Sequence, residues 1–305
     1  MNVVPETLPI ETPRGHFIAR TYGDARAPVV LALHGFPDTP ATFAPLADTL
    51  RRAGYRVVAP FMRGYSPSTL AGPFHLDALA DDVVAIADQV SPARPVVLLG
   101  HDWGAATTYV AAARFPSRVR CAVALAVPHP LAFLRALWRS PAQLRRSWYM
   151  AFFQLPVVPE IALSFDDFAL VERLWRDWSP GHHPSAEQLE EVKRCLRASL
   201  PGPIEYYRAM AWPPREALER LRGPSAPSRR VRVPTLHLAG GDDGCIGPRV
   251  GRGQGDWFDG PFRSETLPGV GHFLHLERPD LVARSILAWL ASWAGIGSML
   301  PPPMR

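Results

Sequence analysis

The feature that most constrains this chain is a strand-to-helix junction with almost no loop. A β-branched, apolar run at residues 96–99 leads directly into the sequence GHDWG at 100–104, and a helical pattern follows. Such a turn must be very tight, so its apex residue, Asp102, is held in a strained backbone conformation. The crowded positions two residues before and after the apex tolerate only small residues, and they are Gly100 and Gly104. The junction therefore predicts a buried strand, a sharp turn that presents Asp102, and a helix.

An aspartate at the apex of this turn indicates a particular chemistry. A serine there would need a base to remove its proton, whereas a carboxylate is already anionic at neutral pH and can attack unaided. The N-terminus of the helix that begins at Trp103 would help to keep Asp102 ionised. A carboxylate suits displacement at a saturated carbon, and its product is an ester on the enzyme that must then be hydrolysed. The alternative interpretation is that Asp102 merely caps the helix, since aspartate is a good capping residue.

Strand and helix patterns alternate along most of the chain. The run at 96–99 is fully apolar, as expected of a central parallel strand that is covered on both faces. The alternation predicts an α/β fold in which helices wrap a mostly parallel sheet. The expected strands are at 29–34, 57–59, 96–99, 119–127, 235–239 and 264–267, and the expected helices are at 42–53, 75–90, 105–115 and 279–294.

The pattern changes in the middle of the chain. No convincing strand occurs from 128 to 221, where helical stretches rich in Trp, Tyr, Phe and Arg dominate, and residues 223–230 have the Gly, Pro and Ser content of a linker. We therefore expect one α/β core, formed by 1–128 and 228–305, that is interrupted by a helical cap with its return linker at 129–227. The clearest helical stretches in the cap are 132–138, 147–153, 168–175 and 186–199.

Five motifs together carry a resemblance to a known family. They are HGFPD at 34–38, RGYSPS at 63–68, GHDWGA at 100–105, GGDDGCI at 240–246 and GVGHFLHLERP at 269–279. With these motifs in this order the chain resembles the epoxide hydrolases of the α/β-hydrolase superfamily, which are close to the haloalkane dehalogenases. The resemblance covers essentially the whole chain, and it implies the α/β-hydrolase fold with an inserted helical cap.

The resemblance also implies the partners of Asp102. In this fold, backbone N–H groups of the HGFPD loop and of the residue after the nucleophile form an oxyanion hole, and here they belong to Phe36 and Trp103. The base comes last in chain order, in the glycine-rich loop before the final helix, which favours His272. The competing histidine, His275, lies deeper in the same motif, where we expect it to be packed or bonded to a neighbour.

The acid of the predicted triad is expected after the strand at 235–239, where two aspartates are adjacent. The spacing Gly-x-x-Asp-x-x-aliphatic within 240–246 selects Asp243, and Asp242 is the alternative. The role of this acid is to fix the tautomer of His272 and to stabilise its imidazolium while the histidine activates water.

The cap sequence favours an epoxide as the substrate. Epoxide opening develops negative charge on the ring oxygen, which needs a proton donor, and the family uses two cap tyrosines for this purpose. Tyr149 precedes the sequence FQLP at 153–156, and Tyr207 begins the sequence YRAM, with Tyr206 as an adjacent decoy. A phenol donates strongly yet remains protonated near neutral pH. The alternative interpretation is that both tyrosines are ordinary packing residues.

Two other functions stay open. A haloalkane dehalogenase would use the same aspartate but would stabilise a departing halide with indole or amide N–H groups. Trp103 could supply one of these donors, and a cap tryptophan could supply the second, because the side chain of Phe36 has no donor. A non-catalytic ligand-binding protein of the same fold is the third possibility, although such proteins usually lose a triad member or a cap donor, and none is missing here.

Composition limits the classes of protein further. The chain has 305 residues, 47% hydrophobic and 20% charged, which is ordinary for a globular protein. Its net charge of +5 comes from scattered arginines and one lysine, Lys193, without the basic stripe of a nucleic-acid-binding protein. No apolar segment reaches the roughly 18 residues that a membrane span needs, and residues 1–14 lack the pattern of a secretory signal.

Cysteine and histidine patterns do not indicate a metal or other cofactor. The chain has three widely spaced cysteines, Cys121, Cys195 and Cys245, and no CxxC motif. We therefore expect no disulfide framework, in keeping with a cytoplasmic protein. His182 and His183 are adjacent, with no further ligand at a suitable spacing, and are expected in a surface loop. The predicted substrate is a small, largely apolar epoxide that reacts with water, and a homo-oligomer is compatible with the sequence.

Overall fold

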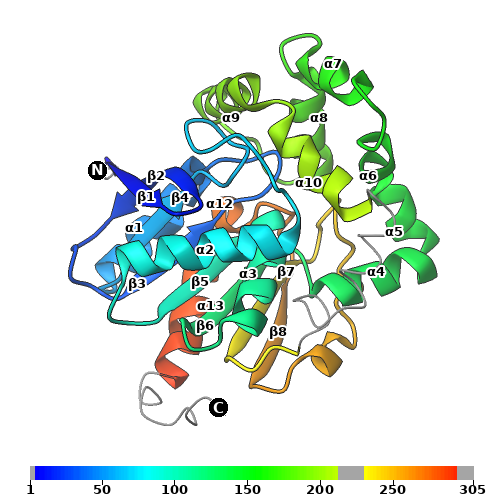
Figure 1. The fold of residues 1–305 in the computed structure, drawn as a ribbon. Coiled ribbons are helices and arrows are strands. Elements are labelled where there is room, and N and C mark those ends of the chain that lie inside the picture. Colours follow the sequence, from blue (N-terminus) through cyan, green and yellow to red (C-terminus); the bar gives the residue numbers. More distant parts are fainter. Residues whose placement is uncertain (1–3, 212–229, 294–305) are drawn as a thin grey trace.

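An eight-stranded sheet forms the centre of the protein. The computed structural model describes residues 4–211 and 230–293 (Figure 1). The strand order is β1-β2-β4-β3-β5-β6-β7-β8; β1 and β2 are antiparallel to their neighbours, and the other strands are parallel. The strands are β1 (Glu6–Thr12), β2 (Gly15–Tyr22), β3 (Val29–Leu33), β4 (Arg56–Pro60), β5 (Val96–His101), β6 (Val119–Leu125), β7 (Thr235–Gly240) and β8 (Phe262–Leu267).

Helices cover both faces of this sheet, and two separate apolar clusters fill the layers between them. In β3, Leu31 and Leu33 belong to the cluster beneath α2 and α3, whereas Val30 and Ala32 belong to the cluster beneath α1 and α13. This alternation follows from the period of two along a strand, and it explains why the central strands are apolar throughout. The core helices are α1 (Ala44–Arg52), α2 (Leu76–Val90), α3 (Trp103–Arg114) and α13 (Pro279–Ser292). Three short helical turns accompany them in the described residues: η1 (Pro40–Phe43), η3 (Gln254–Trp257) and α12 (Leu274–Glu277).

Between β6 and β7 in the sequence, the described residues form a set of helices and no strand. In Figure 1 these helices sit over one end of the sheet, above the carboxyl ends of its parallel strands. We call them the cap helices: α4 (Pro130–Arg139), α5 (Pro141–Arg146), α6 (Trp148–Phe152), α7 (Val158–Ser164), α8 (Ala169–Trp178), α9 (Ala186–Ser199) and α10 (Gly202–Ala211). The return linker expected at 223–230 lies almost wholly outside the described residues.

The predicted fold class is confirmed. Every strand and helix expected for the α/β part is present, with ends that differ by at most two residues, and the helix expected at 42–53 begins as the turn η1. The edge strand β1, which contains Pro9, was not among the expected strands. Proline lacks the N–H that a central strand must donate, and it is tolerated here because β1 has a partner on one side only.

The predicted strain at the strand-to-helix junction is present. Asp102 has φ 51° and ψ −115°, a backbone conformation that L-residues rarely adopt. A Cβ atom on Gly100 would overlap the carbonyl of Gly104, and one on Gly104 would overlap the carbonyl of Leu33. Strands β3 and β5 and helix α3 therefore approach one another closely enough that only glycine fits at both positions.

Lys193 on α9 ties two cap helices and the loop between α7 and α8 together. Its ammonium group lies 2.6 Å from Glu172, 3.0 Å from Asp167 and 3.4 Å from Glu190. The Lys193 side chain is only 7% exposed, although each of the three carboxylates is substantially exposed. Hydrogen bonding to Glu172 and the other two carboxylates raises the pKa of this lysine.

The three cysteines are buried and form no disulfide. Among residues 4–211 and 230–293, no helix has the length and apolar character that crossing a membrane would require.

We predict that Gly104→Ala destabilises the protein by roughly 1–3 kcal/mol, because the added methyl group must displace the backbone of β3. Thermal or urea unfolding would measure the loss. Gly181→Ala is the matched control, because a Cβ there meets no atom within 4 Å. Equal stability of the two variants would contradict the proposed packing at the junction.

Candidate active site

Three loops at the carboxyl ends of parallel strands bring the predicted triad together. Asp102 follows β5, Asp243 follows β7, and His272 follows β8. The Nδ1 atom of His272 lies 2.8 Å from Oδ2 of Asp243, and its Nε2 atom lies 3.7 Å from Oδ2 of Asp102. The imidazole therefore stands between the two carboxylates, hydrogen-bonded to one and facing the other, and all three side chains are buried.

The geometry distinguishes Asp243 from the alternative acid, Asp242. The second oxygen of Asp243 accepts hydrogen bonds from the backbone N–H groups of Cys245 and Ile246, both at 2.7 Å. These bonds fix the orientation of the carboxylate toward His272. Asp242 is exposed to solvent and makes no such contact in the described part of the chain.

Charge interactions in this buried site favour an ion pair. Burial by itself lowers the pKa of His272, but Asp243 and Asp102 outweigh it and raise that pKa to about 10. Burial by itself raises the pKa of Asp102, but the facing imidazolium of His272 lowers it below the ordinary value. Asp102 is therefore an anion, and His272 an imidazolium, at neutral pH.

The predicted oxyanion donors lie beside Asp102. The backbone N–H of Phe36 donates to Oδ1 of Asp102 at 2.9 Å. Trp103 is the first residue of α3, so its N–H is among those at the helix start that have no partner within the helix. The peptide bond between Phe36 and Pro37 is cis.

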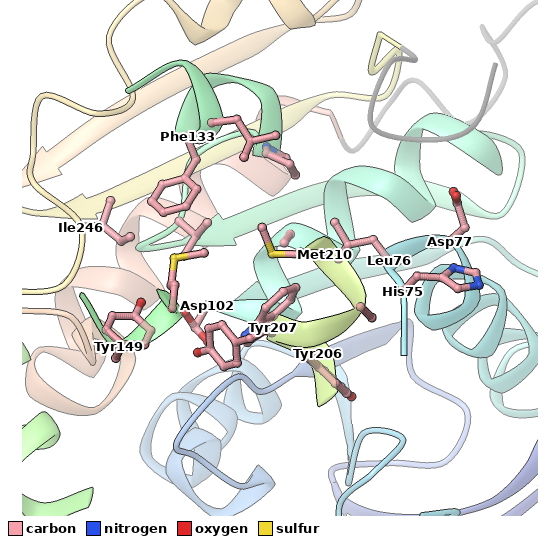
Figure 2. A pocket seen from close by; sticks show the side chains of 17 residues that line it. His75, Leu76, Asp77, Asp102, Phe133, Tyr149, Tyr206, Tyr207, Met210 and Ile246 are labelled. Carbon is pink, nitrogen blue, oxygen red and sulfur yellow. The ribbon is translucent and has the colours of Figure 1, made fainter. Parts of the chain in front are cut away.

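A cavity of about 130 Å³ opens onto Asp102. Figure 2 shows the carboxylate between Tyr149, from α6, and Tyr207, from α10. Most of the remaining lining is apolar, and includes Leu76, Phe133, Met150, Met210 and Ile246. The cavity therefore suits a largely apolar molecule with one polar group held near Asp102.

The two predicted tyrosines differ in their hydrogen bonding. The Tyr149 hydroxyl lies 3.2 Å from Sγ of Cys245, whereas the buried Tyr207 hydroxyl has no hydrogen-bond partner among the described residues. Burial raises the pKa of both phenols well above the ordinary value, so both stay protonated. The third tyrosine of the cavity, Tyr206, donates to the backbone oxygen of Arg63 at 2.6 Å, which directs its hydroxyl away from Asp102.

The cap contributes to the triad through a contact that the sequence did not reveal. The backbone carbonyl of Trp178, at the end of α8, accepts hydrogen bonds from Gly244 N–H at 3.0 Å and from His272 N–H at 3.1 Å. One cap carbonyl thus joins the acid loop to the base loop.

Glu277 makes a second connection between the cap and the base loop. Its carboxylate accepts hydrogen bonds from Gly271 N–H at 2.8 Å and from the Ser179 hydroxyl at 2.6 Å. Glu277 is part of the motif at 269–279, but nothing in the motif indicates its partner.

A second buried polar cluster lies behind the triad. His101 Nε2 lies 3.1 Å from the backbone oxygen of His272, and its Nδ1 lies 3.4 Å from Asp38. His275 contacts the same aspartate and the Thr42 hydroxyl. The ligand atoms of Asp38, His101 and His275 lie within 4.8 Å of one another, a spacing that a metal ion could bridge. Asp38 already accepts hydrogen bonds from Thr39 N–H and the Thr42 hydroxyl, so we assign the cluster to support of the loops around His272.

Comparison with known proteins identifies the family of this chain. The sequence profile of a family described as alpha/beta hydrolase fold matches residues 28–279. Epoxide hydrolase 3 of Xenopus tropicalis is 32% identical over 289 residues, which cover 91% of this chain and 74% of that protein. Epoxide hydrolase 4 of Homo sapiens is 30% identical over 289 residues, which cover 91% of this chain and 75% of that protein.

A solved structure gives the same result for the fold. The crystal structure of an epoxide hydrolase from Bacillus megaterium superposes with a TM-score of 0.81 and 23% identity, and covers 93% of this chain and 100% of that chain. With both the fold and the sequence relationship in agreement, the chain belongs to the α/β-hydrolase superfamily and, within it, to the epoxide hydrolase family.

Proposed function

We propose that this protein hydrolyses an epoxide to a vicinal diol through a covalent ester on Asp102. The observation that carries the proposal is the position of the Asp102 carboxylate, which faces His272 on one side and opens into a cavity lined by Tyr149 and Tyr207. The names of the related epoxide hydrolases support the same reaction class. The substrate that fits the apolar lining is a small, largely apolar epoxide.

In the first step, a carboxylate oxygen of Asp102 attacks one epoxide carbon, and the bond from that carbon to the ring oxygen breaks. The alkoxide that forms takes a proton from Tyr149 or Tyr207, whose raised pKa values keep them protonated until that moment. The product is a hydroxyalkyl ester on Asp102, and one tyrosine is left as a phenolate.

Ester formation removes a negative charge from beside His272. Asp102 is one of the two carboxylates that raise the pKa of the imidazolium, so neutralising it lowers that pKa. The imidazolium can then donate its proton to the tyrosine phenolate. In this way the first step itself converts His272 into the neutral base that the second step needs.

In the second step, His272 takes a proton from water, and the resulting hydroxide attacks the carboxyl carbon of Asp102. The N–H groups of Phe36 and Trp103 stabilise the oxyanion of the tetrahedral intermediate. The intermediate collapses with cleavage of its bond to the diol oxygen. That oxygen takes the proton of the hydroxyl group that the attacking water added to the carboxyl carbon. Asp102 leaves this step as a carboxylate beside a protonated His272, which is the resting state.

A haloalkane substrate fits the cavity less well. Trp103 lines the cavity, but the described lining contains no other tryptophan that could donate to a halide. Trp175 donates its indole N–H to the backbone oxygen of Pro37, and Trp138 is 89% exposed. The cap tryptophan Trp212 lies outside the described residues.

We expect His272→Gln to trap the ester. The variant retains Asp102 as the nucleophile but lacks the base for hydrolysis. Mass spectrometry after incubation with styrene oxide should detect protein that is heavier by one substrate. Asp102→Asn is the control and should stay unmodified. A folded His272→Gln protein that binds styrene oxide without forming an adduct would contradict the covalent mechanism.

The proposed fall in the pKa of His272 can be measured directly. Asp102→Asn replaces the carboxylate with a neutral amide and so imitates the ester. From the effect of removing a neighbouring opposite charge, we expect the pKa to fall from about 10 by about one to three pH units. NMR titration of 15N-labelled histidines, with His272→Gln to assign the signal, would measure it. An unchanged pKa would mean that Asp102 does not control the protonation of His272.

The roles of Tyr149 and Tyr207 separate the epoxide from the halide reaction. Each Tyr→Phe change should slow alkylation of Asp102 by about a hundredfold, because it removes a donor that is needed most in the transition state. The double change should nearly abolish alkylation. Pre-steady-state alkylation by styrene oxide would measure both, with Tyr206→Phe as the matched control. Near-normal alkylation by the double variant would identify the two tyrosines as packing residues.

A further inference from the structure

A basic groove lies on the outside of the cap, separate from the active-site cavity. It has a volume of about 700 Å³ and lies between helices α4 and α5 and the loop at 247–256. Five arginines line it: Arg135, Arg139, Arg146, Arg249 and Arg252. Asp256 is the only acidic residue in the described lining.

The positive charge of this groove is poorly neutralised within the protein. Arg135 lies 4.0 Å from Asp256, and Arg146 donates to the backbone oxygen of Asp243. Arg139, Arg249 and Arg252 are exposed and form no ion pair with another described residue. The sequence adds to the imbalance, because residues 103–159 contain no aspartate or glutamate. The groove therefore presents several guanidinium groups that are well suited to phosphate.

Large exposed apolar side chains occur on the two groove helices, α4 and α5, and at the start of α6, which follows them in the sequence. Trp138 on α4 is 89% exposed, Leu144 on α5 is 61% exposed, and Trp148 at the start of α6 is 42% exposed. In Figure 1 these three helices lie next to one another along one side of the molecule. Exposed tryptophans beside arginines are typical of segments that rest in the interface of a lipid bilayer.

The same helices also form a wall of the active site. Phe133 and Leu134 of α4 and Met150 of α6 face the catalytic cavity, whereas Ala132, Arg135 and Arg139 of α4 face the groove. Helix α4 thus separates the apolar cavity from the basic surface. A molecule dissolved in a lipid phase would be close to the cavity if this side of the protein rested on a membrane.

We propose that the surface formed by α4, α5, the start of α6 and the loop at 247–256 docks on an anionic lipid membrane. The groove arginines bind phosphate groups of the lipids, and Trp138, Leu144 and Trp148 insert among the lipid chains near the surface. This docking needs no chemistry at Asp102, so it can be tested independently of the proposed reaction.

The test is co-sedimentation of the full-length protein with vesicles. Phosphatidylcholine vesicles are compared with vesicles that also contain phosphatidylglycerol, at low and high salt. We expect binding to the anionic vesicles, weakened by salt because the Arg–phosphate attraction is screened. Arg139→Gln combined with Arg249→Gln should weaken binding about twenty-five-fold, at about fivefold for each arginine. Trp138→Ala combined with Trp148→Ala should weaken binding at least several-fold.

Two matched controls separate this surface from general charge or hydrophobicity. Arg173→Gln with Arg176→Gln removes the same charge from exposed positions on α8, and Ile161→Ala with Phe165→Ala removes exposed apolar side chains near α7. All variants change exposed side chains, and their thermal unfolding midpoints should match the wild type. Binding of both control proteins should stay within about twofold of the wild type, well below the effect expected for each groove arginine.

Several outcomes would overturn the proposal. One is an absence of preference for phosphatidylglycerol, and another is an equal loss of binding in the control variants. Binding of glycerol phosphate without binding of vesicles would identify a small-anion site instead. If the wild type sediments as a dimer that Trp138→Ala with Trp148→Ala converts to a monomer, and vesicles are not bound, the surface is a contact between copies of this chain.

Discussion

The close approach of backbone segments around Asp102 is the constraint on which the active site depends. Strand β5 must turn into α3 within a single residue, and the carbonyl groups of Leu33 and Gly104 occupy the space where side chains would otherwise lie. The turn places the Asp102 carboxylate beside the N–H of Phe36 and opposite His272. The strained conformation persists because well-packed strands on both sides leave the chain no other path.

Electrostatic coupling between His272 and its two neighbouring carboxylates determines the protonation states in the site. A histidine between two carboxylates is held as an imidazolium. In the proposed mechanism, that is the wrong state for a base but the right state to stabilise an anionic nucleophile. In the proposed mechanism, ester formation removes the charge of Asp102 and so lowers the pKa of His272. The cap takes part in this arrangement as more than a lid, because the carbonyl of Trp178 fixes the loops of both His272 and Asp243. Displacement of α8 would therefore disturb the relation between acid and base.

The sequence predicted the fold class and the order of the core elements, because both depend on local pattern. It also selected Asp102, Asp243 and His272, which the structure brings together. The periodicity of apolar residues indicates which faces of strands and helices are buried, and the glycines at 100 and 104 indicate a crowded backbone. Contacts between distant segments left no such signal. Two contacts do not follow from the spacing of residues in the sequence: the two hydrogen bonds that the Trp178 carbonyl accepts, and the approach of Cys245 to Tyr149. Both depend on how the cap packs on the core. The basic groove was also missed, because its arginines come from segments more than one hundred residues apart and look scattered along the chain.

The single lysine of this chain has a consequence for its covalent chemistry. Lys193 carries the only side-chain amine in the sequence, and that amine is enclosed by three carboxylates between α9 and its neighbours. Reagents that acylate amines require the neutral, accessible form, which this environment suppresses. Their slow reaction at Lys193 would report how often the α8–α9 contact opens, while the guanidinium groups that supply the remaining positive charge stay unmodified. The rate of acylation at Lys193 itself would thus measure local opening of the cap.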